Sequence, residues 1–152
     1  MLKKACVADL KSRHVVREMG HIAVVMRHYP RGLSKLLIDE YVNALAPQPE
    51  LLKDFLAQKR KLDGNHNAAF QTVDYEKRFR LAEDGVEHLR RLAEMSSGRD
   101  VYLLCQCAMD QRCHRELLLI AARRWFDAKT ELRAFSYPAF EARLPEQPAP
   151  LL

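Results

Sequence analysis

The sequence contains no apolar run that approaches the roughly 20 residues that a membrane-spanning helix requires. Lys3 and Lys4 stand near its start, but charge returns before an apolar segment of signal-peptide length has formed. Internal repeats are also absent, and the one biased segment is the proline-rich stretch 145–152. We therefore expect a cytoplasmic protein that makes no contact with a membrane.

Aromatic residues are scarce, at 8% of the chain, and this bears on the partners that its charge suggests. A net charge of +5 favours anionic partners. The basic pairs, such as Arg90-Arg91 and Arg123-Arg124, are spread along the chain and lack the interleaved aromatic side chains of a single-strand-binding surface. The composition therefore does not favour nucleic acid as the partner.

Hydrophobic residues make up 48% of the sequence and charged residues 30%, which is typical of globular rather than disordered proteins. A chain of 152 residues folds most simply around one core that buries roughly two-thirds of the unfolded surface. We expect a single domain over residues 1–144 and a flexible tail over residues 145–152. The composition does not indicate an oligomeric state.

Apolar runs and helical spacing predict alternating strands and helices. Strands are expected at residues 5–10, 21–26, 101–105 and 131–135. Helices are expected at residues 34–45, from Pro49 to a polar loop at 59–67, from Asp74 to a C-terminal cap at Gly98, and at 113–128. This order predicts an α/β fold in which helices flank a small, mainly parallel sheet.

Two polar segments follow expected strands. Residues 27–32 follow the strand at 21–26, and residues 105–115 follow the strand at 101–105. In open α/β sheets, ligands bind beyond the carboxyl ends of the strands. If these two strands are parallel neighbours, both segments emerge at one edge of the sheet and form one pocket.

The expected helix at 113–128 supplies this pocket with positive charge. Free amide groups at the start of a helix can hold an anion or lower the pKa of a thiol. Arg27, Arg31 and Arg115 add donors that suit an anion, and Tyr29 and Gly32 lie beside them in the sequence. We therefore predict a small anionic ligand, either nucleotide-like or phosphorylated.

Three interpretations of the cysteines stay open. Cys105, Cys107, Cys113 and His114 form a ligand set that zinc accepts, although their spacing departs from the usual zinc pattern. Alternatively, Cys105 or Cys113 is a reactive thiolate beside His114 and the arginines. The third interpretation is plain burial, which we favour for Cys107. An arginine six positions after Cys105 or Cys107, as a cysteine phosphatase requires, is absent.

At these residues the sequence resembles the bacterial and archaeal family called domain of unknown function 488. "LLC" followed by "CHR" at a helix start is similar to the family motif, and "RHYPRGLSK" is similar to its YeaO-like branch. The resemblance spans roughly residues 21–125 and implies an α/β fold and a pocket, but no reaction. The motif positions fall on Arg27, Pro30, Arg31, Gly32, Cys105, Cys113, His114 and Arg115.

The sequence departs from the family pattern at two positions. Cys107 stands where many members have an acidic residue, and Met26 stands where the YeaO-like branch often has aspartate. If either carboxylate were a general base, this chain would lack it or replace it.

The combined prediction is an enzyme with Cys105, Cys113 and His114 as its chemical groups. Arg27, Tyr29, Arg31, Gly32 and Arg115 are the predicted ligand-binding residues. No cofactor is expected unless zinc occupies the cysteines and His114. The alternatives are a non-catalytic basic module that binds nucleic acid or a protein partner, and a metal-binding regulator.

Overall fold

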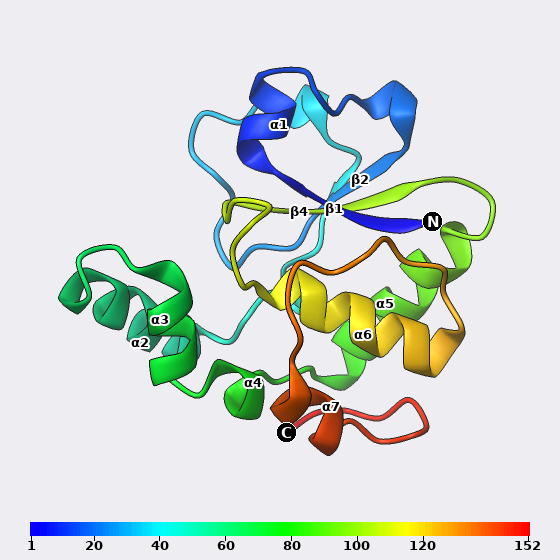
Figure 1. Cartoon of the computed structure of the whole chain (residues 1–152). Helices are drawn as coiled ribbons and strands as arrows, with labels where there is room; N and C mark the ends of the chain where they lie inside the picture. The colour runs from blue at the N-terminus through cyan, green and yellow to red at the C-terminus, as the bar shows by residue number, and fades with distance from the viewer.

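A four-stranded parallel sheet forms the centre of the computed structural model, which describes all 152 residues. Its strand order is β1-β4-β2-β3, and every neighbouring pair is parallel. The strands are β1 (Leu2–Cys6), β2 (His21–Val24), β3 (Glu40–Tyr41) and β4 (Val101–Cys105). Because helices flank this sheet on both faces, the predicted α/β fold is confirmed (Figure 1).

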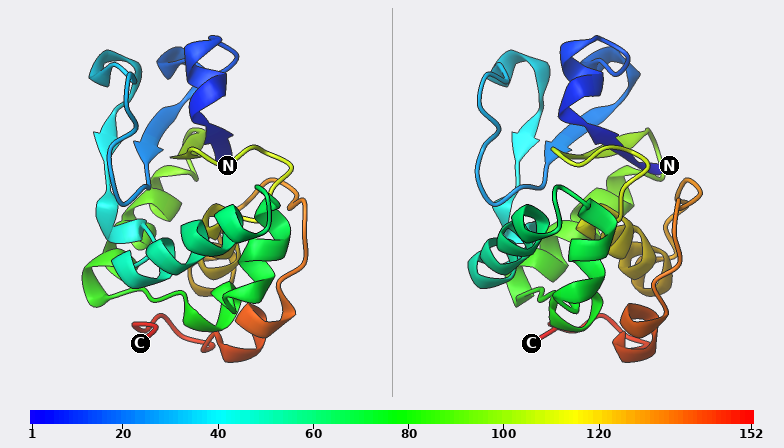
Figure 2. Two further views of the ribbon diagram at one scale, coloured as in Figure 1. Left: turned by 90° about the vertical axis from the view of Figure 1, so that its left-hand side faces the viewer. Right: turned by 60° about the vertical axis from the view of Figure 1, so that its left-hand side comes forward.

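Seven α-helices surround the sheet. They are α1 (Val7–Lys11), α2 (Pro49–Lys61), α3 (His66–Thr72), α4 (Tyr75–Arg78), α5 (Glu83–Met95), α6 (His114–Phe126) and α7 (Pro138–Arg143). In Figure 1, α1 covers one face of the sheet, α5 and α6 lie against the other, and α2 and α3 project to one side. Figure 2 shows α7 and the C-terminus at the end farthest from the sheet. None of these helices has both the length and the apolar character needed to cross a membrane.

The core is divided by the sheet into two clusters. Side chains of a strand alternate between its faces, so Val101 and Leu103 of β4 join the larger cluster, whereas Tyr102 and Leu104 join the smaller one. All five residues of β4 are buried, as its continuous apolar run predicts. By the same alternation, Cys105 points to the side of the sheet that α5 and α6 cover.

The first strand begins and ends earlier than predicted. β1 occupies Leu2–Cys6 rather than residues 5–10, because the chain turns into α1 directly after Cys6. The carboxylate of Asp9 accepts a hydrogen bond of 3.0 Å from the backbone N–H of Cys6. This contact, typical of a capped helix start, ends the strand.

Residues 34–45 do not form the predicted helix. Ser34 caps a helical turn as expected, but this segment contains only two short 3-10 turns, Lys35–Leu37 and Asn43–Leu45. Between these turns the chain adds β3 to the sheet, and the backbone N–H groups of Asp39 and Val42 donate to β2 carbonyls at 2.9 and 2.8 Å. Pairing with the open edge of β2 outweighs the helical spacing, which is a local signal only.

The predicted helix at 74–98 is two helices, α4 and α5, and it ends at Met95 rather than at Gly98. Between the two helices, Leu81 exchanges two backbone hydrogen bonds with Leu151, at 2.9 and 2.8 Å. The C-terminal segment therefore pairs with backbone groups that a continuous helix would pair internally. Local spacing carries no information about so distant a partner.

Residues 131–135 form no strand, so the prediction of a last strand is wrong. Thr130 makes a single parallel bridge to Leu2, and the Glu131 carboxylate accepts a hydrogen bond of 2.5 Å from the backbone N–H of Lys4. The Glu131 side chain, together with the backbone hydrogen bonds that Leu2 makes with Lys129 and Glu131, thus satisfies the edge of β1 in place of a strand.

The proline-rich tail contacts the helical layer. Leu151 is buried in the larger core cluster, and the indole N–H of Trp125 donates to the carbonyl of Pro145 at 2.8 Å. The predicted flexibility of residues 145–152 and the boundary at residue 144 stay predictions.

The close approach of α5 to the turn before α2 gives a test of this packing. A Cβ added at Gly85 would lie 2.7 Å from the carbonyl oxygen of Ala44 and 2.6 Å from Leu81 Cδ1. We expect Gly85→Ala to lower the free energy of unfolding by about 1–3 kcal/mol through overpacking, measured by urea denaturation. Gly98→Ala is the control, since its Cβ would meet nothing closer than 4.0 Å. Equal stability of both variants would contradict this close packing.

Candidate functional site

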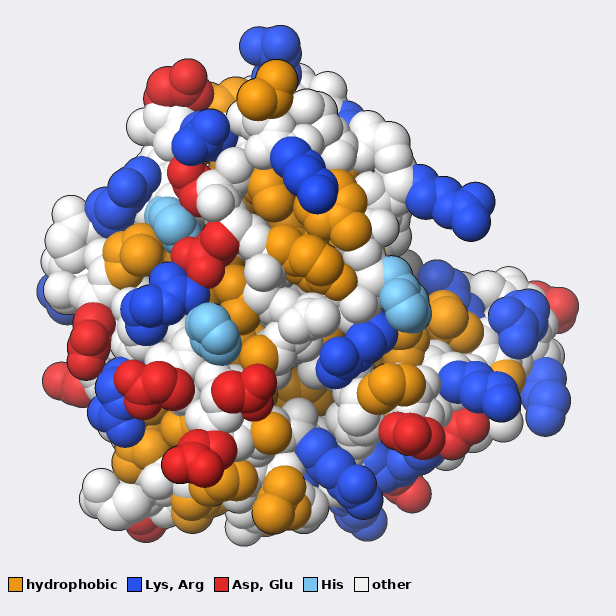
Figure 3. All heavy atoms as spheres, turned by 180° about the vertical axis from the view of Figure 1, so that it is seen from behind, with side chains coloured by type: hydrophobic (Ala, Val, Ile, Leu, Met, Phe, Trp, Pro, Cys, Tyr) orange, Lys and Arg blue, Asp and Glu red, His pale blue; other side chains and the backbone are white.

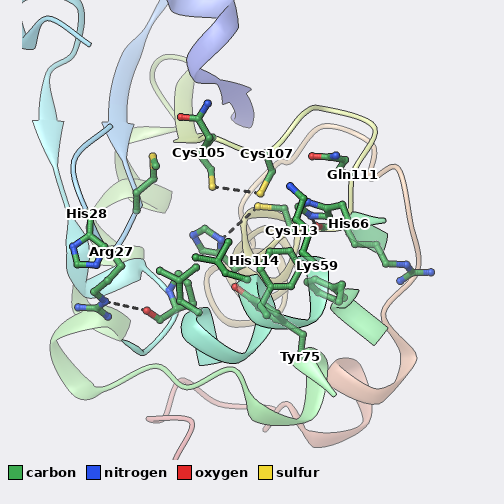
Figure 4. A pocket seen from close by; sticks show the side chains of 18 residues that line it. Arg27, His28, Lys59, His66, Tyr75, Cys105, Cys107, Gln111, Cys113 and His114 are labelled. Carbon is green, nitrogen blue, oxygen red and sulfur yellow. Dashed lines mark hydrogen bonds between the residues drawn. The ribbon is translucent and has the colours of Figure 1, made fainter. Parts of the chain in front are cut away.

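A cavity of about 280 Å³ opens where the two polar segments emerge from the sheet. β2 and β4 are parallel neighbours, with Val24 in register with Leu104, so the residues that follow them leave at the same edge. The segment after β2 contributes residues 26–28 to the cavity wall, and the segment after β4 contributes residues 105–107 and 111–114. Helices α2 and α3 form the opposite wall (Figure 4).

Three consecutive residues at the start of α6 lie at this edge of the sheet, and two of them attach the helix to it. Cys113 is the N-cap residue of α6. His114 Nε2 donates to the carbonyl of Val25, after β2, at 2.7 Å. Arg115 Nη1 donates to the carbonyl of Ala5 in β1. The helix start is therefore anchored to strands on both sides of β4.

Arg115 is fully buried and uses its guanidinium within the protein. Its Nη2 donates to the carbonyls of Cys107 and Ala108 at 2.9 and 3.2 Å, and its Nε lies 3.3 Å from Cys113 Sγ. The side chain does not line the cavity. We predicted Arg115 as a ligand-binding residue; the structure instead places it behind Cys113, where it fixes the loop and supplies positive charge to the sulfur.

The three sulfur atoms of the motif form one cluster. Cys105 Sγ lies 3.8 Å from Cys107 Sγ and within 4.8 Å of Cys113 Sγ. Cys113 Sγ lies 3.4 Å from His114 Nδ1. Figure 4 shows the sulfur atoms facing one another above the imidazole. Cys6, the fourth cysteine, does not line the cavity.

Opposing effects determine the pKa of Cys113. Burial disfavours the thiolate, but hydrogen bonds from Cys105 and Cys107 and the positive charges of Arg115 and His114 outweigh it, so the pKa of Cys113 lies well below its usual range. Cys113 is therefore the sulfur of the cluster that carries negative charge most readily.

The other two thiols are held in the protonated state. A hydrogen bond with Cys107 favours the Cys105 thiolate, but donation to Cys113 and burial outweigh it and raise the pKa of Cys105 to about 12. Hydrogen bonds to Cys105 and Cys113, together with burial, raise the pKa of Cys107 well above its usual range. Negative charge in the cluster is therefore favoured on Cys113 over Cys105 and Cys107.

The orientation of His114 suits it to exchange a proton with Cys113. A carbonyl can only accept, so the contact with Val25 requires the proton of the neutral ring to be on Nε2. Nδ1 then presents its lone pair to Cys113 Sγ at 3.4 Å. Transfer of the thiol proton to this nitrogen would leave a thiolate beside an imidazolium.

Three predicted ligand-binding residues lie outside the cavity wall. Tyr29 packs edge-on against Tyr41, with ring centroids 5.5 Å apart, and Arg31 and Gly32 are exposed. The turn they form faces α1, where Lys11 Nζ donates to the Arg31 carbonyl at 3.5 Å. The roles predicted for these residues are therefore not supported by their positions. Arg27 does line the cavity.

Residues of α2, α3 and the following helix also line the cavity, although the sequence did not indicate them as site residues. His66 falls in the expected polar loop 59–67, but it is the first residue of α3, is buried and lines the cavity. The cavity wall also includes Lys59, Tyr75 and Arg112. The sequence does contain a signal for helix α3, because Asn65 suits a helix N-cap and apolar residues follow His66 at helical spacing.

His66 carries one buried nitrogen that has no partner. Its Nε2 donates to the carbonyl of Arg112 at 2.7 Å, and its Nδ1 makes no hydrogen bond. Burial lowers the pKa of His66, opposed in part by that hydrogen bond. His66 therefore adds a neutral imidazole to the cavity wall.

Part of the predicted zinc ligand set is assembled. Cys105, Cys113 and His114 offer ligand atoms that all lie within 4.8 Å of one another, with Cys107 next to Cys105. The donor types fit zinc, and a histidine that donates its other N–H to a carbonyl is common among zinc ligands. Bound zinc would supply Lewis-acid chemistry at this point; zinc binding stays an open alternative to the expected absence of a cofactor.

Fold and site together define a parallel α/β protein with a buried Cys/His cluster at the carboxyl edge of its sheet. Residues 6–127 match the family model described as "Active DUF488-N3 subclade". The chain therefore belongs to the domain of unknown function 488 family, which confirms the predicted family; the YeaO-like branch stays a prediction. No curated protein and no solved structure matches the chain.

The charge distribution predicts which thiol reacts first. Since the pKa of Cys113 is lowered, its thiolate should persist as the pH falls below the range of an ordinary thiol, about 8.5. Cys6 is the internal reference, because burial raises its pKa. We expect iodoacetamide to label Cys113 before Cys6 at pH ~6, as measured by peptide mass spectrometry. A Cys113 labelling rate that rises tenfold per pH unit up to pH ~8.5 would contradict this charge distribution.

Proposed function

We propose that the protein is an enzyme that binds a small ligand with an anionic group and an apolar body, and that Cys113 attacks it as the nucleophile. One observation carries the proposal: Cys113 Sγ is at the cavity wall, at the start of α6, between Arg115 Nε at 3.3 Å and His114 Nδ1 at 3.4 Å. A thiol next to a cation and a base is the arrangement that nucleophilic catalysis requires.

The composition of the cavity supports an anionic ligand. Arg27, Lys59 and Arg112 line it, whereas no aspartate or glutamate does. Arg27 donates from Nε and Nη2 to the carbonyls of Pro47 and Ala46, at 3.0 and 3.5 Å, which leaves Nη1 for a ligand. Lys and Arg side chains also gather on the projecting lobe formed by α2 and α3 (Figure 3). This positive charge would attract an anion and orient it.

The remaining wall supports an apolar portion of the ligand. Leu52 and Phe55 of α2 and Phe70 of α3 line the cavity beside Tyr75. Pockets for small molecules are typically apolar with a few polar groups that fix orientation. A nucleotide-like or phosphorylated aromatic compound combines the two properties.

The reaction class follows from the groups at the sulfur. The Cys113 thiolate would form a bond to an electrophilic carbon of the ligand while the bond to the leaving group breaks. His114, having taken the thiol proton on Nδ1, is placed to return it to the leaving group. Water would then release the ligand from the sulfur. Arg115 would stabilise the thiolate before attack and again after release.

Phenyl phosphate tests the proposal, because it combines an anion with an apolar ring. We expect it to slow iodoacetamide labelling of Cys113. Lys59→Ala or Arg27→Ala should weaken this protection roughly tenfold, which corresponds to the loss of one charge-assisted hydrogen bond of about 1.5 kcal/mol. The measurement is the labelling rate as a function of phenyl phosphate concentration.

The matched control is Arg31→Ala, which removes an exposed arginine outside the cavity and should leave protection unchanged. Benzyl alcohol serves as the uncharged ligand. Protection of Cys113 by benzyl alcohol that equals protection by phenyl phosphate would exclude the anion site. The same protection in the two cavity variants and in Arg31→Ala would exclude it as well. A nucleic acid probe tests the non-catalytic alternative. If the protein binds it, and if added salt weakens this binding steeply through counterion release, the non-catalytic alternative is favoured.

A further inference from the structure

The cysteine cluster contains more sulfur than a single nucleophile requires. Cys105 Sγ lies 3.8 Å from Cys107 Sγ and within 4.8 Å of Cys113 Sγ, and Figure 4 shows the three sulfur atoms facing one another. A thiolate with a neighbouring thiol is the arrangement in which an oxidised cysteine is converted to a disulfide.

Cys107 is better placed to move than Cys105. Cys105 is the last residue of β4, in register with Cys6 of β1, and is buried. Cys107 lies in the irregular segment between β4 and α6 and is half-buried. Disulfide formation requires the two sulfurs to approach to about 2 Å with a defined dihedral angle. A loop residue can adjust to this demand more readily than a residue paired in a central strand.

We propose that Cys113 is a site of oxidation by small hydroperoxides and that Cys107 resolves the product as a reversible Cys107–Cys113 disulfide. The inference goes beyond the proposed function and shares with it only the requirement that Cys113 Sγ is reached from the cavity. Hydrogen peroxide is far smaller than the cavity of about 280 Å³.

The chemistry balances with the peroxide as the sole oxidant. The Cys113 thiolate attacks one peroxide oxygen, the O–O bond breaks, and the second oxygen leaves as hydroxide or alkoxide, which takes a proton from His114. Cys113 is then a sulfenic acid. The Cys107 sulfur attacks the Cys113 sulfur, the S–O bond breaks, and the oxygen leaves as water with the Cys107 proton. Two electrons have passed from the thiols to the peroxide.

Trypsin gives a direct test, since cleavage after Arg112 and Arg115 separates Cys113 from the other two thiols. Cys105 and Cys107 fall in peptide 100–112, and Cys113 falls in peptide 113–115. We expect stoichiometric hydrogen peroxide, followed by iodoacetamide and non-reducing digestion of the full chain, to link these peptides. Dithiothreitol should release them.

Single substitutions identify the partner. Cys105→Ser should retain the linked peptides. Cys107→Ser should lose them and instead accumulate a Cys113 sulfenic acid that dimedone traps. Cys6→Ser is the matched control and should behave like the unsubstituted chain.

Other outcomes would overturn the inference. These are a bond within peptide 100–112, a link to peptide 5–11 that contains Cys6, loss of the linked peptides in Cys105→Ser, or no linkage at all. Labelling of Cys113 by iodoacetamide without peroxide separates the two proposals. If Cys113 is labelled but peroxide forms no link to Cys107, only this inference fails; if Cys113 is not labelled, the nucleophile of the proposed function fails as well.

Discussion

The buried guanidinium of Arg115 is the contact on which the carboxyl edge of the sheet depends. It donates to Ala5 in β1, to Cys107 and Ala108 after β4, and to the sulfur of Cys113 at the start of α6. A buried carbonyl left without a donor costs about 1–3 kcal/mol. One side chain therefore satisfies the backbone of two segments and also compensates the negative charge of the thiolate.

Each of the three consecutive residues 113–115 makes a different contact. Cys113 presents sulfur to the cavity, His114 ties the helix to the end of β2, and Arg115 ties it to the end of β1. Consecutive residues at a helix start project in different directions, so one turn can contact several strands. Folding of this edge and assembly of the reactive group are thus the same event, and neither anchor can change without moving the sulfur.

Strand polarity was the part of the site that sequence could predict. The runs at 21–24 and 101–105 are short, apolar and followed by polar residues, so a shared edge follows from general rules of parallel sheets if the two strands are parallel neighbours. The structure supplies that condition, because β2 pairs with β4. The wrong helix at 34–45 and the missing strand at 131–135 have one cause: both segments bind the edges of the sheet through contacts that local spacing does not encode. His66 was missed because its burial depends on α3 packing over the loop before α6.

The site has two parts, one that follows from the sheet edge and one that depends on tertiary packing. The reactive group is built from the sheet edge and the start of α6, where backbone hydrogen bonds leave little freedom, and this part follows from a short motif. The opposite wall comes from α2 and α3, whose contribution of Lys59 and His66 depends on tertiary packing. Substitution within α2 and α3 can alter the shape and charge of the cavity without disturbing the anchors of Cys113. Under the proposed function, the motif would fix the reactivity of Cys113, and the helices that cover it would set the choice of ligand.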